Sequence, residues 1–235
     1  MGLWEHKVGW PGADGGFIGR TVGPAAGSEA PDPVQEAMAD LGAEALVEAQ
    51  QVHGGEVVRV RARDLAGKGT LLVPDADGLL TDVPGVALAI YVADCLAIFL
   101  HHPGAPAVGL AHAGWRGLAA GIPGTLVERA LAEHGGRAGD LRLALSPCIR
   151  RCCFEVGEEV AELFEGVPGA VDRSRTMAHV DMVAVARAQI TAAGVPEAAV
   201  EVMPGCTHCE PERFASYRWD SERCGRNVAL IALAR

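Results

Sequence analysis

Two histidines and a cysteine, each next to an apolar segment, have side chains that bind metal ions. His53 lies in Gln51-Val52-His53-Gly54, Cys95 follows Asp94 after an apolar run, and His112 begins the run His-Ala-Gly-Trp-Arg-Gly. A Cys/His/His set suits zinc, and three protein ligands leave a fourth position open for water or substrate. Zinc fingers use closely spaced pairs of ligands instead, so the wide spacing here predicts a catalytic metal site.

Two alternatives use the same residues. Cys95 and His112 could form a thiolate–imidazole dyad in which the cysteine attacks an acyl carbon. Each of the three residues could also be an ordinary polar group of the core or of a loop. His53 separates the dyad from the zinc site, because a dyad does not need it whereas a three-ligand site does.

Two arginines and two aspartates are candidates for further roles in the site. The guanidinium forks of Arg116 and Arg218 match two phosphate oxygens, and a buried ion pair is the rival interpretation for both. Asp77 is a candidate substrate-binding residue and general acid or base, with an Asx turn as the alternative. Asp94 is expected to orient a ligand imidazole or to cap the turn that follows it.

The remaining cysteines form a less regular pattern. Cys206-Thr-His-Cys209 resembles half of a zinc knuckle, and Cys148, Cys152 and Cys153 could supply the other half, but a second C-x2-C pair is missing. We therefore expect buried thiols there. The chain has seven cysteines, an odd number, and Met1–Trp10 does not resemble a secretion signal, so we expect reduced thiols in a cytoplasmic protein.

Apolar segments bounded by turn residues predict the strands that must position these groups. Val86–Val92 and Ala107–Ala111 are expected strands that end close to Cys95 and His112. Further strands are expected at Val57–Arg63, Leu79–Leu80, Leu141–Leu145, Val200–Met203 and Val228–Leu233, and helices at Asp32–Leu41, Leu118–Glu133, Glu155–Phe164 and Met182–Ala193. Because strands and helices do not alternate strictly, we expect one α/β (α+β) domain over residues 1–235, with a single mixed sheet between helices.

Composition and charge restrict the classes of partner. Hydrophobic residues make up 49% of the chain and charged residues 21%, which is ordinary for a globular protein with a buried core. The net charge of −10 argues against nucleic acid or an anionic membrane as a partner. The longest apolar run, Val86–Leu100, contains Asp94 and is shorter than the ~20 residues of a transmembrane helix. We expect a buried strand, a turn and a second strand there.

Several motifs in order along the chain resemble one known family. Besides the stretches around His53, Cys95 and His112, they are Asp75-Ala-Asp-Gly-Leu-Leu-Thr-Asp82, Pro147-Cys-Ile with Cys152-Cys-Phe-Glu-Val-Gly157, and Cys206-Thr with Phe214-Ala-Ser-Tyr-Arg218. From about Gln51 to Ile231 the chain is similar to the laccase-domain, or multicopper polyphenol oxidoreductase, family. The family usually has Gly-Pro where this chain has Arg150-Arg151, and its Asn-Arg pair ahead of the first helix is missing here although Gly15-Gly16-Phe17 is present.

This resemblance implies a zinc-dependent purine nucleoside phosphorylase with adenosine deaminase activity. The substrates would be purine nucleosides and inorganic phosphate, and His53, Cys95 and His112 would hold the metal. For such substrates, Arg116, Arg218 and Asp77 are the residues from the analysis above that we expect to make contacts. The resemblance also implies a fold like that of toxin-type cysteine hydrolases.

Two other functional classes are alternatives to a zinc-dependent nucleoside enzyme. Copper-dependent oxidation of phenols, which the older family name indicates, needs His-x-His pairs for a trinuclear centre, and His101-His102 is the one close pair in the sequence. Copper could still occupy an N/S site in vitro, because it outranks zinc in intrinsic affinity. The non-enzymatic alternative is an accessory protein that zinc stabilises.

Overall fold

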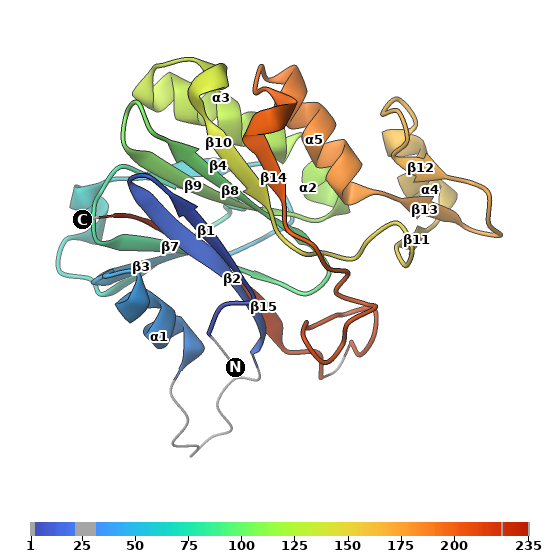
Figure 1. The fold of residues 1–235 in the computed structure, drawn as a ribbon, viewed down its shortest axis with the longest axis horizontal. Coiled ribbons are helices and arrows are strands. Elements are labelled where there is room, and N and C mark those ends of the chain that lie inside the picture. The colour runs from blue at the N-terminus through green and yellow to red at the C-terminus, as the bar shows by residue number, and fades with distance from the viewer. Residues whose placement is uncertain (1–2, 22–31, 222, 235) are drawn as a thin grey trace.

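The strands of the computed structural model, which describes residues 3–21, 32–221 and 223–234, form two large sheets and a small one (Figure 1). The first sheet has the order β1 (His6–Trp10), β2 (Ala13–Thr21), β15 (Arg226–Leu233), β7 (Val86–Val92), β3 (Ala45–Ala49) and β5 (Thr70–Val73). The second has the order β14 (Val200–Val202), β10 (Arg142–Leu145), β8 (Leu96–His102), β9 (Ala107–Ala113), β6 (Gly78–Thr81) and β4 (Val57–Val60). The small sheet consists of β11 (Glu155–Val156), β13 (Ala178–Val180) and β12 (Val171–Asp172) and projects from one side of the molecule (Figure 1).

Helices cover the outer faces of the two large sheets. They are α1 (Pro33–Asp40), α2 (Trp115–Ala119), α3 (Ile122–His134) and α5 (Met182–Ala192). The short helix α4 (Glu158–Ala161) instead lies beside β13 of the small sheet. Helix α1 packs on the first sheet, and α2, α3 and α5 lie over the second (Figure 1). The alternation of side chains along β8 divides it between two cores, since Ala97 and Phe99 face the first sheet whereas Ile98 and Leu100 face the helices. None of the described helices is long and apolar enough to cross a membrane.

The strands that lead to the predicted metal ligands are where the sequence placed them. Val86–Val92 is β7, and the expected second strand after the turn is β8. The third strand is longer than predicted, because β9 continues to Ala113 and includes His112. Strands β8 and β9 are antiparallel neighbours in the centre of the second sheet.

The helix boundaries agree with the sequence where a cap is present. Asp32 accepts a hydrogen bond from the Val34 N–H at the start of α1, and Asp181 accepts one from the Ala184 N–H at the start of α5. The predicted helix Leu118–Glu133 is instead two helices, because Gly121 has a φ of 80° that interrupts the helical backbone. The predicted helix Glu155–Phe164 is shortened to α4 and a 3-10 turn at Glu162–Phe164, because Glu155 and Val156 pair with β13.

Three predictions about the strands were wrong. The expected single mixed sheet is in fact two large sheets, each with parallel and antiparallel pairs, and a small antiparallel sheet. Strand β4 ends at Val60, because the Asp64 carboxylate accepts the Arg61 N–H and starts a 3-10 turn. Strands β1 and β2 were missed because β2 is rich in glycine. A Cβ at Gly15 would lie 2.4 Å from the Leu230 carbonyl oxygen, so close pairing with β15 excludes the larger residues that mark a strand.

Candidate metal centre

Three side chains from separate elements meet beside the second sheet, where β8 begins and β9 ends. His53 lies in the loop before β4, Cys95 joins β7 to β8, and His112 is in β9. One ligand atom of each residue lies within 4.8 Å of those of the other two. The two imidazole rings are nearly perpendicular, with 4.7 Å between their centroids. The structure thus brings together all three residues of the predicted ligand set.

Strand register places Asp77 beside two of these residues. Gly78 pairs with Ala111 in the antiparallel β6–β9 ladder, so Asp77 lies opposite His112 and its carbonyl accepts the His112 N–H at 2.7 Å. Gly78 also pairs with Val57 in the parallel β4–β6 ladder. This second pairing brings the loop that carries His53 alongside Asp77.

The Asp77 carboxylate is fully buried and accepts three hydrogen bonds. Its Oδ1 lies 2.7 Å from His112 Nδ1 and 2.9 Å from the His53 backbone nitrogen, and its Oδ2 lies 2.6 Å from the Gly54 nitrogen. Although burial alone would raise it, the hydrogen bonds from His112 and Gly54 hold the pKa of Asp77 below its ordinary value. The ionised carboxylate only accepts, so His112 donates from Nδ1 and its Nε2 is left for a metal.

That Asp77 contacts substrate stays a prediction, and two observations weigh against it. Asp77 is completely inaccessible to solvent and is not part of the pocket wall described below. Its oxygens are occupied by the groups that carry two of the three candidate ligands. Asp77 positions His53 and His112.

The loop that carries His53 has an unusual backbone. Gln51 and His53 have φ angles of 60° and 62°, in the left-handed region that non-glycine residues rarely adopt. The Gln51 side chain stabilises this loop by donating to the Tyr91 carbonyl at 2.7 Å and accepting the Tyr91 N–H at 2.9 Å. These two hydrogen bonds hold the loop from which His53 reaches Cys95.

Cys95 and His112 stabilise each other's charged forms. Burial would raise the pKa of the Cys95 thiol, but hydrogen bonds with His112 and His53 lower it to about 7. Burial would lower the pKa of His112, but Asp77 and Cys95 raise it to about 9. A thiolate at neutral pH is the form of cysteine that binds metals.

The residues present fit a zinc ion. One thiolate and two imidazoles form a donor set that zinc prefers, with a coordination position left open. Gly114 keeps the space beside the ligands free, because a Cβ at this position would lie 2.9 Å from Cys95 Sγ and 3.4 Å from His53 Cδ2. A residue larger than glycine would push on both side chains.

The three ligands lie in the wall of a pocket of about 630 Å³, a volume suited to a small organic ligand. Its wall includes four aromatic side chains, from Tyr91, Trp115, Phe154 and Tyr217. Three arginines, Arg116, Arg218 and Arg226, also line it. The pocket therefore combines flat apolar surfaces with positive charge next to the candidate metal site.

Arg116 and Arg218 both occupy exposed positions in the pocket wall. The Arg116 guanidinium lies 4.1 Å from the centroid of the Trp115 ring, and no ion pair with Arg116 is found in the described part of the chain. Arg218 donates from Nη1 to the Glu155 carbonyl at 3.0 Å. The rival interpretation, a buried ion pair, does not describe either residue.

Asp94 lies in the pocket wall and fastens a second loop there. It accepts hydrogen bonds from Thr207 Oγ1 and from the Arg218 backbone nitrogen, each at 2.7 Å. The sequence suggested that Asp94 orients an imidazole or caps the turn after it. Its carboxylate instead binds these two groups. Arg226, at the start of β15, was missed because its one sequence signal is a charge next to an apolar strand.

The His101-His102 pair and the remaining cysteines lie outside the group formed by His53, Cys95 and His112. His101 and His102 lie away from the site, where His101 stacks on Trp10 and His102 Nε2 is 2.9 Å from the Gly135 carbonyl. The prediction of buried thiols is correct for Cys148 and Cys206, but Cys153 is only partly buried. Cys152 and Cys209 are exposed, and they lie close to Cys153 and Cys206.

The chain is similar to known proteins over most of its length. Residues 18–234 match the family model described as multi-copper polyphenol oxidoreductase laccase. The chain is 38% identical to purine nucleoside phosphorylase YlmD of Geobacillus stearothermophilus over 192 residues, which are 77% of this chain and 70% of that protein. It is 34% identical to adenosine deaminase RL5 from an unknown prokaryotic organism, over 79% of this chain and 74% of that protein.

A solved structure supports the same relationship. The crystal structure of YlmD from Geobacillus stearothermophilus superposes with a TM-score of 0.79 at 31% identity, covering 95% of this chain and 93% of that one. The mixed α/β fold is thus that of YlmD-like structures. The expected likeness to cysteine-hydrolase toxins was not confirmed.

Proposed function

The chain belongs to the multi-copper polyphenol oxidoreductase laccase family, and from that premise we propose that it is a zinc-dependent purine nucleoside phosphorylase with adenosine deaminase activity. The observation that carries this proposal is the group of His53, Cys95 and His112 in the wall of a pocket that also contains arginines and aromatic rings. Relatives named for each of the two activities share a third or more of their aligned residues with this chain.

The ligand residues and their support would hold the zinc ion. His112 would bind through Nε2 because its Nδ1 donates to Asp77, and Cys95 would bind as the thiolate that His112 and His53 already favour. When bound, zinc supplies Lewis acidity that can activate a water molecule or orient an anionic oxygen.

The rest of the pocket would select and orient the substrates. Aromatic faces such as those of Trp115 and Phe154 suit the flat purine ring. Arg116 and Arg218 would bind inorganic phosphate, because a guanidinium fork matches two phosphate oxygens. Phosphate held there would attack the C1′ carbon of the ribose, and the purine base would leave.

Deamination needs a different set of groups. Attack of water on the purine C6 displaces ammonia, and no anion has to be bound. The positions of the arginines therefore matter for phosphorolysis and much less for deamination.

The alternatives make different demands on the site. A cysteine hydrolase would use Cys95 and His112 alone, yet a ligand atom of His53 lies within 4.8 Å of those of both. A copper-dependent polyphenol oxidoreductase of the multicopper type would need further histidines, and the described residues hold one His/Cys group at the pocket.

One experiment tests the proposal against these alternatives. Purified protein of measured metal content is incubated with adenosine, inosine and guanosine, with and without phosphate, and the products are separated by chromatography. We expect free base and ribose 1-phosphate only when phosphate is present, and inosine from adenosine in either case. Metal-loaded protein that leaves all three nucleosides unchanged would refute the proposal.

A further inference from the structure

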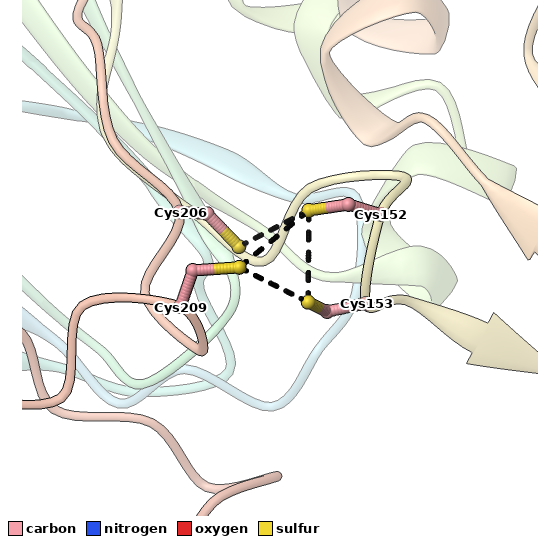
Figure 2. Close-up of side chains that lie close together, drawn as sticks. All are labelled: Cys152, Cys153, Cys206 and Cys209. Atoms are coloured by element: carbon pink, nitrogen blue, oxygen red, sulfur yellow. Dashed lines mark hydrogen bonds between the residues drawn. The ribbon is translucent and has the colours of Figure 1, made fainter.

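Four cysteine side chains converge at a place that the proposed nucleoside site does not include. Cys152 and Cys153 lie in the turn before β11, and Cys206 and Cys209 lie in the loop after β14 (Figure 2). Their sulfur atoms all lie within 4.8 Å of one another. Figure 2 shows the two pairs pointing toward each other from the two segments.

The distances between these sulfur atoms fit a tetrahedral metal site. The Sγ atom of Cys152 lies 3.7 Å from that of Cys206, 3.8 Å from that of Cys209 and 3.6 Å from that of Cys153. Zinc–sulfur bonds of about 2.3 Å place the corners of a tetrahedron about 3.8 Å apart. Cys153 and Cys209, at 3.3 Å, are the one close pair that would have to separate slightly.

Hydrogen bonds hold the two segments in place around the sulfurs. The Arg150 backbone nitrogen donates to Cys206 Sγ at 3.4 Å, and the Arg150 guanidinium donates to the carbonyls of Met203 and Gly205. The backbones of Cys148 and Cys206 pair side by side in an isolated parallel β-bridge, while both thiols are free. The arrangement therefore does not depend on the cysteines alone.

Charge around the cluster also suits bound thiolates. Four thiolates around a divalent cation carry more negative charge than the cation neutralises. The Arg150 guanidinium donates to the carbonyls of Met203 and Gly205, just before Cys206, and Arg175 donates to the Cys152 carbonyl at 2.9 Å. These two guanidiniums place positive charge beside the segments that carry the cysteines.

We propose that Cys152, Cys153, Cys206 and Cys209 form a second, structural metal site that binds a zinc ion through four thiolates. Binding exchanges the thiol protons for the cation, with no change in oxidation state. Four protein ligands complete the tetrahedron and leave no position for substrate, unlike the three-ligand site at His53, Cys95 and His112.

The proposed site joins two loops that contribute to the pocket wall. Phe154 follows Cys153 directly, and Thr207, between the other two cysteines, donates to Asp94. Asp94 in turn accepts the Arg218 N–H. A cation at the cysteines would therefore stabilise the loops that place Phe154 and Arg218 in the pocket.

Metal counting on three proteins tests this proposal. The purified wild-type chain should contain about two zinc ions, because each ligand set is supplied once. The double variant His53→Ala/His112→Ala should retain about one, and so should Cys152→Ser/Cys209→Ser. Cys224→Ser, at a buried cysteine outside the cluster, is the matched control and should retain about two. A Cys152→Ser/Cys209→Ser protein with as much zinc as the wild type would overturn the proposal.

Two measurements on unaltered cysteines guard against misfolded variants. Cobalt loaded into the His53→Ala/His112→Ala variant should give the visible and charge-transfer bands of a tetrahedral tetrathiolate centre, and bands of an octahedral oxygen site would refute it. In zinc-loaded wild-type protein, Cys152 and Cys209 should resist alkylation despite their exposure until a chelator is added. Immediate alkylation, or intact masses that reveal disulfides in protein purified without oxidant, would also overturn the proposal.

Discussion

Asp77 Oδ1 lies 2.7 Å from His112 Nδ1, and the same oxygen accepts the backbone N–H of His53. One buried atom thus fixes two candidate metal ligands that come from different parts of the chain. Such carboxylate–histidine pairs set the orientation and basicity of a ligand imidazole. The geometry of the proposed metal site therefore depends on Asp77 as much as on the ligands.

Asp77→Asn should weaken zinc binding by roughly ten- to a hundred-fold. Asparagine can still accept hydrogen bonds from His53 and His112, but its amide nitrogen would face the Gly54 N–H, which now donates to Oδ2 at 2.6 Å. Competition with a chromophoric chelator measures the affinity. Asp77→Ala should lose more affinity and also lower the melting temperature, because each buried donor without a partner costs roughly 1–3 kcal/mol. Equal zinc affinity in the wild type and both variants would contradict this role for Asp77.

The sequence predicts the ligand set better than it predicts the surroundings of that set. His53, Cys95 and His112 follow apolar segments that are easily recognised as strands, and strand ends collect at sheet edges. The role of Asp77 depends on the register of β6 against β9. Register is a tertiary property that hydrophobic pattern alone does not fix between distant strands.

Neither the division into two large sheets nor the cysteine cluster could be predicted from local sequence patterns, because both depend on contacts between distant segments. Strand β2 contains glycines that close pairing with β15 requires, so it lacks the usual β-branched signal. Cys152 and Cys153 are adjacent in the chain and do not form a C-x2-C pair. The sequence offers Cys148, Cys152 and Cys153 as partners of Cys206 and Cys209. Only the packing of the turn before β11 against the loop after β14 selects Cys152 and Cys153 from these.

Gly114→Ala should reduce both metal content and activity. The added Cβ would lie 2.9 Å from Cys95 Sγ, and relief of such overpacking typically costs about 1–3 kcal/mol. If Cys95 yields, the zinc affinity should fall on the order of ten- to a hundred-fold. Gly139→Ala is the control, because no atom lies within 4 Å of its Cβ position. Full zinc content in Gly114→Ala after dialysis against a chelator would count against the proposed ligand.

In metal-free protein, alkylation of Cys95 should be half-maximal near pH 7, since its pKa is lowered to about 7. The thiolate reacts and the thiol does not, so the lowered pKa moves the reactive range to lower pH. His112 has its pKa raised to about 9 and is still an imidazolium there. His112→Ala should therefore shift the Cys95 profile to higher pH, as mass spectrometry of the modified peptide can measure. Identical profiles in the two proteins would show that the imidazolium does not stabilise the thiolate.

Arg116→Ala should separate the two nucleoside reactions. Arg116 lines the pocket, stacks on Trp115 and has no ion pair among the described residues, so its guanidinium is available to bind phosphate. Hydrogen bonds to charged groups are worth roughly 1.5–3 kcal/mol, and their loss should raise the phosphate concentration needed for half-maximal phosphorolysis on the order of ten- to a hundred-fold. Arg116→Lys should recover part of this loss, because lysine keeps the charge without the fork.

Deamination of adenosine by the same Arg116 variants is the internal control, because that reaction binds no anion. It should change little as long as the zinc content is unchanged. Arg137→Ala is the matched surface variant, since Arg137 pairs only locally with Asp140, and it should affect neither reaction. A parallel loss of both activities together with a lower melting temperature in Arg116→Ala would instead assign Arg116 a role in holding the loop after His112.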